Sequence, residues 1–165
     1  MKKIILTLSL SLISFLSIAQ DFVVPKYEFK SVADYSKYEK EIVACIDWLF
    51  ETPIIIDKYK RKAANKFLFQ WLSGSPDVHI EINPSVITFI ETSPDLLLIF
   101  MGGWAKYAIE AEGAENKLEG QKAGINAVID FYTKNESVIK QDKNVKKLIK
   151  LKKKGKLDEF LGIDA

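Results

Sequence analysis

Side chains suited to catalysis are scarce in this chain, which has one histidine, His79, and one cysteine, Cys45. An acyl-transfer site needs a general base beside a nucleophile and an orienting acid, and no Gly-x-Ser-x-Gly turn is present to hold such a nucleophile. A structural zinc site needs a tetrahedral set of Cys and His ligands, which these two residues cannot complete. The sequence therefore assigns no catalytic residue, no metal ligand and no cofactor.

The positions of these two residues indicate structural roles. Cys45 lies between Ile42 and Ile46 at helical spacing, which is typical of a buried thiol that packs as a small hydrophobe. His79 lies in the alternating segment 78–82, where a polar side chain is expected to face solvent. A small hydrolase or lyase built from carboxylates, with His79 assisting, remains an alternative.

Arg61 is the one arginine of the chain, and it offers a planar fork of donors that lysine cannot imitate. Asp57 lies one helical turn before it and Asn65 lies one turn after it. Arg61 with Asn65 could anchor a carboxylate or phosphate ligand. The alternative is an Asp57–Arg61 pair on the helix surface, which is worth a few tenths of a kcal/mol.

Three aromatic residues form a second candidate contact surface, and they are Trp71, Trp104 and Tyr107. Packing in the core explains aromatic residues of this kind more simply. Together with Arg61 and Asn65, they make up the candidate ligand-binding residues.

Lysines concentrate near the C-terminus of the chain. Residues 134–156 contain ten lysines and two acidic residues, which predicts a basic amphipathic helix over 138–154. Its lysines could contact anionic lipid or another acidic polymer, and the alternative is a solvated helix face. The residues of this basic surface are Lys143, Lys146, Lys147, Lys150, Lys153 and Lys154.

The N-terminal segment is typical of a secretory signal peptide. Two lysines precede an uncharged apolar run over 4–18, which ends in the small-x-small pattern of a cleavage site. The run is shorter than the roughly 20 residues that a membrane-spanning helix needs. We expect residues 1–19 to be removed, with cleavage after Ala19 or Gln20, and the mature protein to be exported to the periplasm or the extracellular space.

Removal of that segment changes the charge of the protein. The whole chain has 24 basic and 22 acidic residues, and Lys2 and Lys3 are lost with the segment, which leaves 22 of each. The mature protein is then neutral, with an acidic body and a basic C-terminal helix, so a nucleic-acid partner is not expected. One cysteine cannot form an internal disulfide, and no later stretch is apolar enough to span a membrane.

Apolar residues at helical spacing recur along the mature chain and predict a single all-α domain over 20–165, built from five or six helices. Capping residues before proline, at Thr52-Pro53, Asn83-Pro84 and Ser93-Pro94, predict three helix starts. A short extended segment is expected near 78–82. The predicted helices are 32–51, 53–72, 94–112, 115–134 and 138–154, with a short helix or turn at 84–90 and a last turn at 157–161.

The helix over 94–112 is expected at the centre of the fold, because it is apolar on most sides. Its Gly102-Gly103 pair costs about 1 kcal/mol of helix propensity per glycine relative to alanine. We expect this cost to be offset because the glycines let another backbone approach closely. The helix over 115–134 offers a matching groove of small residues, which are Gly120, Ala123, Gly124 and Ala127.

Two segments resemble those of a known group of proteins. They are Phe67-Leu68-Phe69-Gln70-Trp71 with Gly74-Ser75-Pro76, and Met101-Gly102-Gly103-Trp104-Ala105-Lys106-Tyr107. In these segments the chain is similar to an uncharacterised group of short secreted bacterial proteins with no assigned function. The resemblance covers most of the mature chain and implies a small exported protein, and it brings no activity or catalytic residues with it.

The sequence favours an exported, non-enzymatic binding or interaction protein whose partner is an unidentified protein or small ligand. The carboxylate-based hydrolase or lyase is the first alternative. The second alternative is an envelope-associated protein that uses its basic C-terminal helix for weak contact with an anionic surface.

Overall fold

The computed structural model describes residues 22–111 and 116–163, so the predicted signal peptide over 1–19 lies outside the described residues. The described residues form seven α-helices and one 3-10 helix and no strand, which confirms the predicted all-α fold. The elements are α1 (Val32–Lys37), α2 (Glu39–Glu51), α3 (Lys58–Leu72), η1 (Thr88–Glu91), α4 (Leu96–Glu110), α5 (Lys117–Lys134), α6 (Lys143–Lys153) and α7 (Leu157–Leu161).

The predicted helix over 32–51 is divided at Tyr38. This residue has φ −102° and ψ 5°, and it ends α1 directly before α2 begins. A capping box closes the other end of α1, where the Ser31 backbone N–H donates to the Asp34 carboxylate at 2.9 Å. The division, together with the separate helix α7, brings the number of helices above the five or six expected.

Thr52-Pro53 does not start a helix, contrary to the prediction. α3 begins five residues later, at Lys58, where the Lys60 backbone N–H donates to the Asp57 side chain at 3.0 Å. The chain turns between α2 and α3 because the carbonyl groups of Thr52 and Pro53 accept hydrogen bonds from a buried side chain, that of Arg61. The prediction from local capping rules is wrong here, because the contact of Arg61 with Thr52 and Pro53 is tertiary and these rules do not include it.

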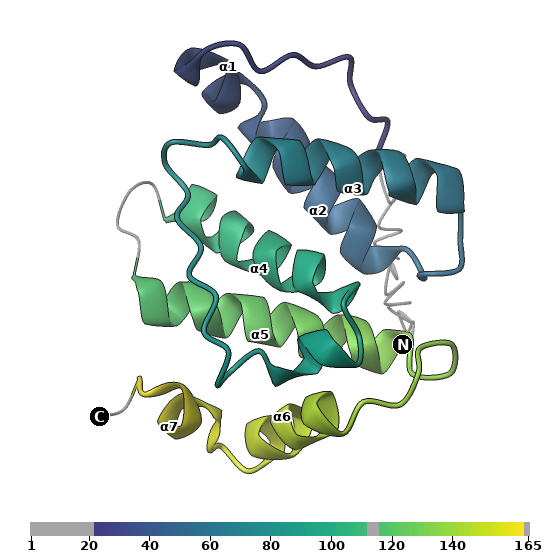
Figure 1. Ribbon diagram of the computed structural model, residues 1–165, viewed down its shortest axis with the longest axis vertical. Coiled ribbons are helices and arrows are strands. Elements are labelled where there is room, and N and C mark those ends of the chain that lie inside the picture. The colour runs from purple at the N-terminus through teal and green to yellow at the C-terminus, as the bar shows by residue number, and fades with distance from the viewer. Residues whose placement is uncertain (1–21, 112–115, 164–165) are drawn as a thin grey trace, which may run out of the picture.

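The segment over 78–82 forms no strand with any described residue. It runs as an irregular connection from α3 towards η1 and passes in front of α4 (Figure 1). Val78 is buried in it, and Ile80 packs partly buried against the core. Where the sequence predicts a short extended segment, the structure has an irregular connection between helices.

The helices lie in three tiers, which Figure 1 shows from top to bottom. α2 and α3 lie with α1 in the first tier, α4 and α5 form the middle tier, and α6 and α7 form the third. α4 contributes to two apolar cores: Phe100 and Trp104 lie in the core with α5, α6 and α7, and Ala105 and Ala108 lie in the core with α2 and α3. The central, largely buried position expected for the helix over 94–112 is thus observed.

α4 and α5 approach each other closely through small residues. A Cβ atom added to Gly103 would lie 2.6 Å from the Cβ of Ala127 and 2.9 Å from the carbonyl oxygen of Ala123. A Cβ atom added to Gly124 would lie 2.7 Å from the carbonyl oxygen of Phe100. Because packed atoms do not approach so closely, only glycine fits at these positions, and the predicted close approach at Gly103 is confirmed.

Buried polar side chains fix two connections of the fold. Asp142 caps α6, accepts a hydrogen bond from the Ser93 hydroxyl at 2.9 Å, and donates its backbone N–H to the Tyr132 hydroxyl at 3.0 Å. Asn135, at the end of α5, accepts from the Ile54 backbone N–H at 2.9 Å. The second contact ties the connection between α2 and α3 to the middle tier.

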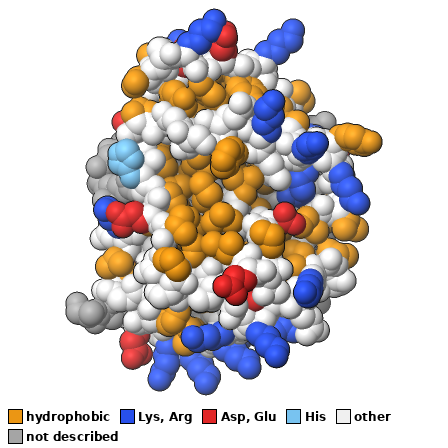
Figure 2. Space-filling view, viewed as in Figure 1, with side chains coloured by type: hydrophobic (Ala, Val, Ile, Leu, Met, Phe, Trp, Pro, Cys, Tyr) orange, Lys and Arg blue, Asp and Glu red, His pale blue; other side chains and the backbone are white. Residues whose placement is uncertain are grey.

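Figure 2 shows one face of the molecule in the same view, with apolar side chains at its centre and lysines along the edge where α6 lies. Among the described residues, no helix combines the length and the apolar character that crossing a bilayer requires.

Candidate functional site

Arg61 lies on α3 and is 8% exposed. Its guanidinium donates to the carbonyl oxygen of Leu49 at 3.1 Å and to that of Thr52 at 2.5 Å. Leu49 lies in the last turn of α2 and Thr52 is the residue that caps this helix, so neither carbonyl has an intrahelical donor. The guanidinium carbon also lies 5.5 Å from the Trp48 ring centre and 5.7 Å from that of Phe131. Arg61 therefore joins α2, α3 and α5.

The electrostatic state of Arg61 follows from this burial. Desolvation lowers the pKa of the guanidinium, although an arginine starts from about 12 or higher and stays charged at neutral pH. Its Nε atom is buried and has no hydrogen-bond partner among the described residues. Asp57 does not pair with it as the alternative interpretation expected, because the Asp57 side chain caps α3 instead.

A cavity of about 320 Å³ opens beside Arg61, and we name it the Arg61 cavity. α3 supplies its polar side and α4 supplies much of its apolar side. The structure thus brings together Arg61 and Asn65, two of the residues predicted from the sequence. The lining residues are Ile54, Lys58, Arg61, Lys62, Asn65, Asp95, Leu98, Ile99 and Phe131.

The charges that line the Arg61 cavity are mostly positive. Lys58, Arg61 and Lys62 lie against one acidic residue, Asp95. Lys58 and Lys62 are exposed and form no ion pair with any described residue. A concave site with apolar walls and an excess of one charge is suited to a small ligand of opposite charge that also has an apolar part.

The candidate contact surface of Trp71, Trp104 and Tyr107 is not formed. Trp71 and Trp104 are each 1% exposed and belong to different cores. The Trp71 indole N–H donates to the carbonyl oxygen of Tyr35 at 3.0 Å, so its polar atom is satisfied inside the protein. Packing in the core accounts for both tryptophans, and only Tyr107 lines a hollow in the surface.

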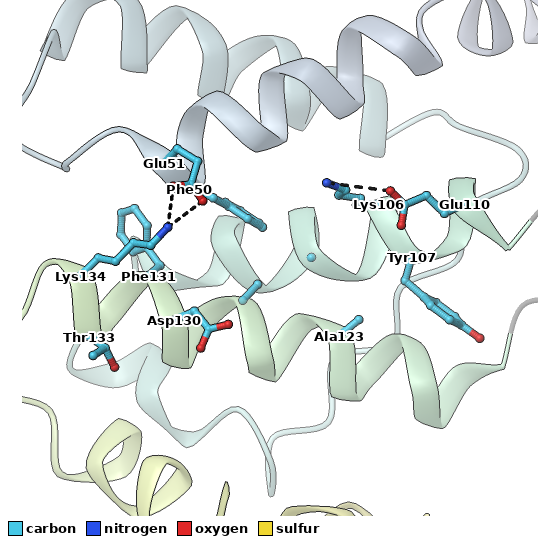
Figure 3. Close-up of a pocket in the computed structure, with 12 residues that line it drawn as sticks. Phe50, Glu51, Lys106, Tyr107, Glu110, Ala123, Asp130, Phe131, Thr133 and Lys134 are labelled. Carbon is cyan, nitrogen blue, oxygen red and sulfur yellow. Dashed lines mark hydrogen bonds and ion pairs between the residues drawn. The ribbon is translucent and has the colours of Figure 1, made fainter. Parts of the chain in front are cut away.

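That hollow is a groove of about 640 Å³ between the end of α2 and the helices α4 and α5. Its floor holds the small residues of the α4–α5 contact. The charges on its rim are paired: Lys134 binds Glu51 at 2.6 Å, and Lys106 lies 3.9 Å from Glu110, as Figure 3 shows. The groove, although larger than the Arg61 cavity, offers no set of unpaired groups that converge on a ligand.

The two side chains with the greatest chemical reactivity lie apart from both hollows. Cys45 is buried, donates weakly to the carbonyl oxygen of Ala64 at 3.5 Å, and has its pKa raised to about 12 by desolvation. His79 is exposed on the connection between α3 and η1. The described residues contain no group of three or more His, Cys, Asp or Glu side chains that could hold a metal ion.

The predicted basic surface lies on α6 and its end. Lys143, Lys147, Lys150, Lys153 and Lys154 are exposed, and Lys146 is half-buried and lies 3.4 Å from Glu136. The apolar residues Val145 and Leu148 face the core. The helix therefore presents lysines outward, with Ile149 and Leu151 partly buried against the core.

Sequence reasoning identified Arg61 and Asn65 and missed the other residues of the Arg61 cavity. Lys58 and Lys62 share a helix face with Arg61 and Asn65, so a signal for these two lysines was present in the sequence. Asp95 and the apolar wall from α4 come from a distant part of the chain. No local pattern points to them.

Comparison of the chain with protein-family models, with curated proteins and with solved structures finds no match. These comparisons do not bear on the resemblance to short secreted bacterial proteins, which stays a prediction. The class that the fold and the site define is an all-α domain with a cation-lined cavity between two helices.

Proposed function

We propose that this protein is an exported, non-enzymatic binding protein that holds a small amphiphile with an anionic head in the Arg61 cavity. The observation that carries the proposal is that Lys58, Arg61, Lys62 and Asn65, on one face of α3, line one open cavity together with apolar residues of α4. The cavity lies near the lower end of the size range of ligand pockets, about 300–1,000 Å³, so the ligand is small.

The two sides of the cavity have different tasks. Leu98 and Ile99 of α4 remove the apolar part of the ligand from water, at about 25 cal/mol for each Å² buried. Lys58 and Lys62 attract the anionic head with side chains that have no acidic partner in the described structure. The outer nitrogens of Arg61 already bind the carbonyls of Leu49 and Thr52. Arg61 therefore fixes the end of α2 beside the cavity, and it contributes its positive charge without a direct hydrogen bond to the ligand.

The reactive side chains favour binding over catalysis. A nucleophilic cysteine needs a thiolate at working pH, and the pKa of Cys45 is raised to about 12 by burial. His79 is exposed and does not line either of the two hollows described above. The carboxylates of the groove, Glu51, Glu110 and Asp130, each lie within ion-pair distance of a lysine, so the hydrolase or lyase alternative finds no free acid pair there.

Calorimetric titration with octanoate tests the binding proposal, with octanol as the uncharged control. Octanoate is expected to bind one site, and octanol to bind more weakly. Lys58→Gln with Lys62→Gln is expected to weaken octanoate binding by about 3- to 10-fold, because two exposed charges are lost. Asp95→Asn is expected to strengthen octanoate binding, because it removes the acidic residue of the lining.

A variant that blocks the cavity makes the test specific. Asn65→Trp places a large side chain in the cavity and is expected to abolish octanoate binding. Lys66→Trp introduces the same side chain at the next, exposed position, which does not line the cavity, and is expected to leave binding unchanged. Equal octanoate affinity in both variants would contradict the proposal.

Export is tested separately, by mass spectrometry of the protein recovered from a bacterial host. Cleavage after Ala19 or Gln20 gives a first residue of Gln20 or Asp21. Recovery of an uncleaved chain from the cytoplasm would contradict export and leave the octanoate test valid.

A further inference from the structure

Three large apolar side chains are exposed together where α2 is joined to α3. Ile55 is 54% exposed, Ile56 is 50% exposed and Tyr59 is 92% exposed. Single exposed apolar residues are ordinary on a protein surface, whereas several within one short segment mark an interaction site. We name these three residues the 55–59 patch.

The backbone beneath the 55–59 patch is held by buried polar groups. The Ile54 N–H donates to Asn135 at 2.9 Å, and the guanidinium of Arg61 binds the carbonyl of Thr52. Asp57 has φ 43°, a left-handed conformation that is uncommon outside glycine, and its side chain caps α3. The fold thus fixes the connection in a shape that directs isoleucines into solvent.

Lysines without acidic partners lie beside the patch. Lys58 falls within the same segment and Lys62 lies one helical turn further along α3, and neither forms an ion pair with a described residue. Apolar and aromatic side chains next to lysines are the combination that binds an anionic bilayer: the apolar groups enter the interface and the ammonium groups meet the phosphates. We infer that the 55–59 patch docks on an anionic lipid bilayer.

Charge favours a bilayer over a second copy of this chain as the occupant. A two-fold symmetric contact centred on the patch would gather Lys58 and Lys62 of both copies around its axis with one acidic residue, Asp57, from each, so that an excess of positive charge repels. A membrane that contains anionic lipid has the opposite charge and attracts them.

The lysine-rich helix α6 is the rival membrane contact. Every residue of α6 is described: Val145 and Leu148 lie in the core, and Ile149 and Leu151 pack partly buried against it. α6 can therefore attract a bilayer mainly by charge, whereas the 55–59 patch adds exposed apolar side chains.

This inference is independent of the proposed ligand. Ile55, Ile56 and Tyr59 do not line the Arg61 cavity, but Ile54, Lys58 and Lys62 do. Docking by the patch would bring the edge of the cavity to the membrane surface, where amphiphiles with anionic heads reside.

Vesicle sedimentation tests the inference, with the exported protein and vesicles of phosphatidylglycerol and phosphatidylcholine. The protein is expected to bind these vesicles and not vesicles of phosphatidylcholine alone. Ile55→Ser with Ile56→Ser is expected to lower partitioning by about tenfold or more. Val32→Ser with Val138→Ser removes two exposed apolar side chains elsewhere and is expected to bind as the parent protein does.

A charge-matched pair of variants separates the two faces. Lys58→Gln with Lys62→Gln is expected to weaken vesicle binding more than Lys150→Gln with Lys153→Gln, which removes the same charge from α6. The inference is overturned if the α6 variant alone loses binding, if the Ile55 and Ile56 variant binds like its control, or if the parent protein does not bind. Dimerisation that the same serines abolish would also overturn it, by assigning the patch to a second copy.

The octanoate titration keeps the two proposals apart. The Ile55→Ser and Ile56→Ser variant is expected to bind octanoate with unchanged affinity, which also shows that it is folded. Loss of vesicle binding with octanoate binding retained supports the docking patch. Octanoate binding that fails in the parent protein would overturn the proposed function and leave the vesicle result standing.

Discussion

The α4–α5 contact and the junction of α2 with α3 bring helices together in opposite ways. At the first, glycines let two backbones meet with no room for a further methyl group. At the second, a buried arginine binds the end of α2, and a cavity of about 320 Å³ remains beside it. The difference separates a contact in which two backbones leave no room between them from a junction whose cavity is lined by lysines without acidic partners in the described structure.

The burial of polar groups also differs between the two regions. The α4–α5 contact at Gly103 involves no polar side chain. The atoms closest to Gly103 are the Cβ of Ala127 and backbone atoms of Ala123 and Gly124. The α2–α3 junction depends on Arg61 and Asn135, each of which satisfies a backbone group of the connection between the helices. Loss of either side chain leaves a buried donor or acceptor without a partner.

The largest effect is expected at the α4–α5 contact. Gly103→Ala adds a Cβ atom at 2.6 Å from that of Ala127, so the helices must separate, at a cost of about 2–4 kcal/mol after the gain in helix propensity. Urea unfolding, followed by tryptophan fluorescence, measures the loss.

The neighbouring glycine supplies the control for that change. A Cβ atom at position 102 would lie 3.3 Å from the end of the Phe50 ring, which is a side chain that can shift. Gly102→Ala is therefore expected to change stability by less than about 1 kcal/mol, because helix propensity offsets the tight contact. Equal losses at the two glycines would remove the distinction between a closed and an adjustable contact.

The next effect is expected at Arg61. Arg61→Met keeps the apolar stem but leaves the carbonyls of Leu49 and Thr52 without donors, at a cost of about 2–3 kcal/mol. Lys62→Met alters an exposed neighbour and is expected to change stability by less than about 0.5 kcal/mol. If the two variants unfold at the same urea concentration, Arg61 is not what holds the junction together.

A smaller effect is expected at Asn135. Asn135→Ala removes the acceptor of the Ile54 N–H and is expected to cost about 1–2 kcal/mol. Asn126→Ala, on the same helix α5, removes a buried oxygen that has no partner in the described structure and is expected to be neutral or slightly stabilising. Thermal unfolding of the two variants measures the contrast, and a greater loss at Asn126 would contradict it.

The smallest effect is expected at Cys45, in the contact of α2 with α3. Cys45→Ala leaves a small cavity at a cost of about 1 kcal/mol, since the thiol makes one weak hydrogen bond. Because burial raises the pKa of Cys45 to about 12, the native thiol should be labelled by iodoacetamide at pH 8 far more slowly than the unfolded one. Rapid native labelling would mean that this contact opens to solvent.

The same two regions show what the sequence can predict. The α4–α5 contact could be predicted, because Gly102-Gly103 and the small residues of α5 are local patterns that each helix carries by itself. The role of Arg61 could not, because its acceptors lie at the end of α2 and meet it only after the helices pack. Trp71 and Trp104 show the same limit. A tryptophan can belong to a binding surface or to the core, and only the packing of the helices buries these two.

Nuclear magnetic resonance mapping of octanoate on the protein without residues 1–19 is the sharpest test of the Arg61 cavity as the binding site. Backbone amide signals of Asn65, Leu98 and Ile99, which line the Arg61 cavity, are expected to shift with saturation, while those of Ala123 and Ala127 in the α4–α5 groove stay unchanged. Shifts centred on the groove, or none at high octanoate concentration, would contradict it.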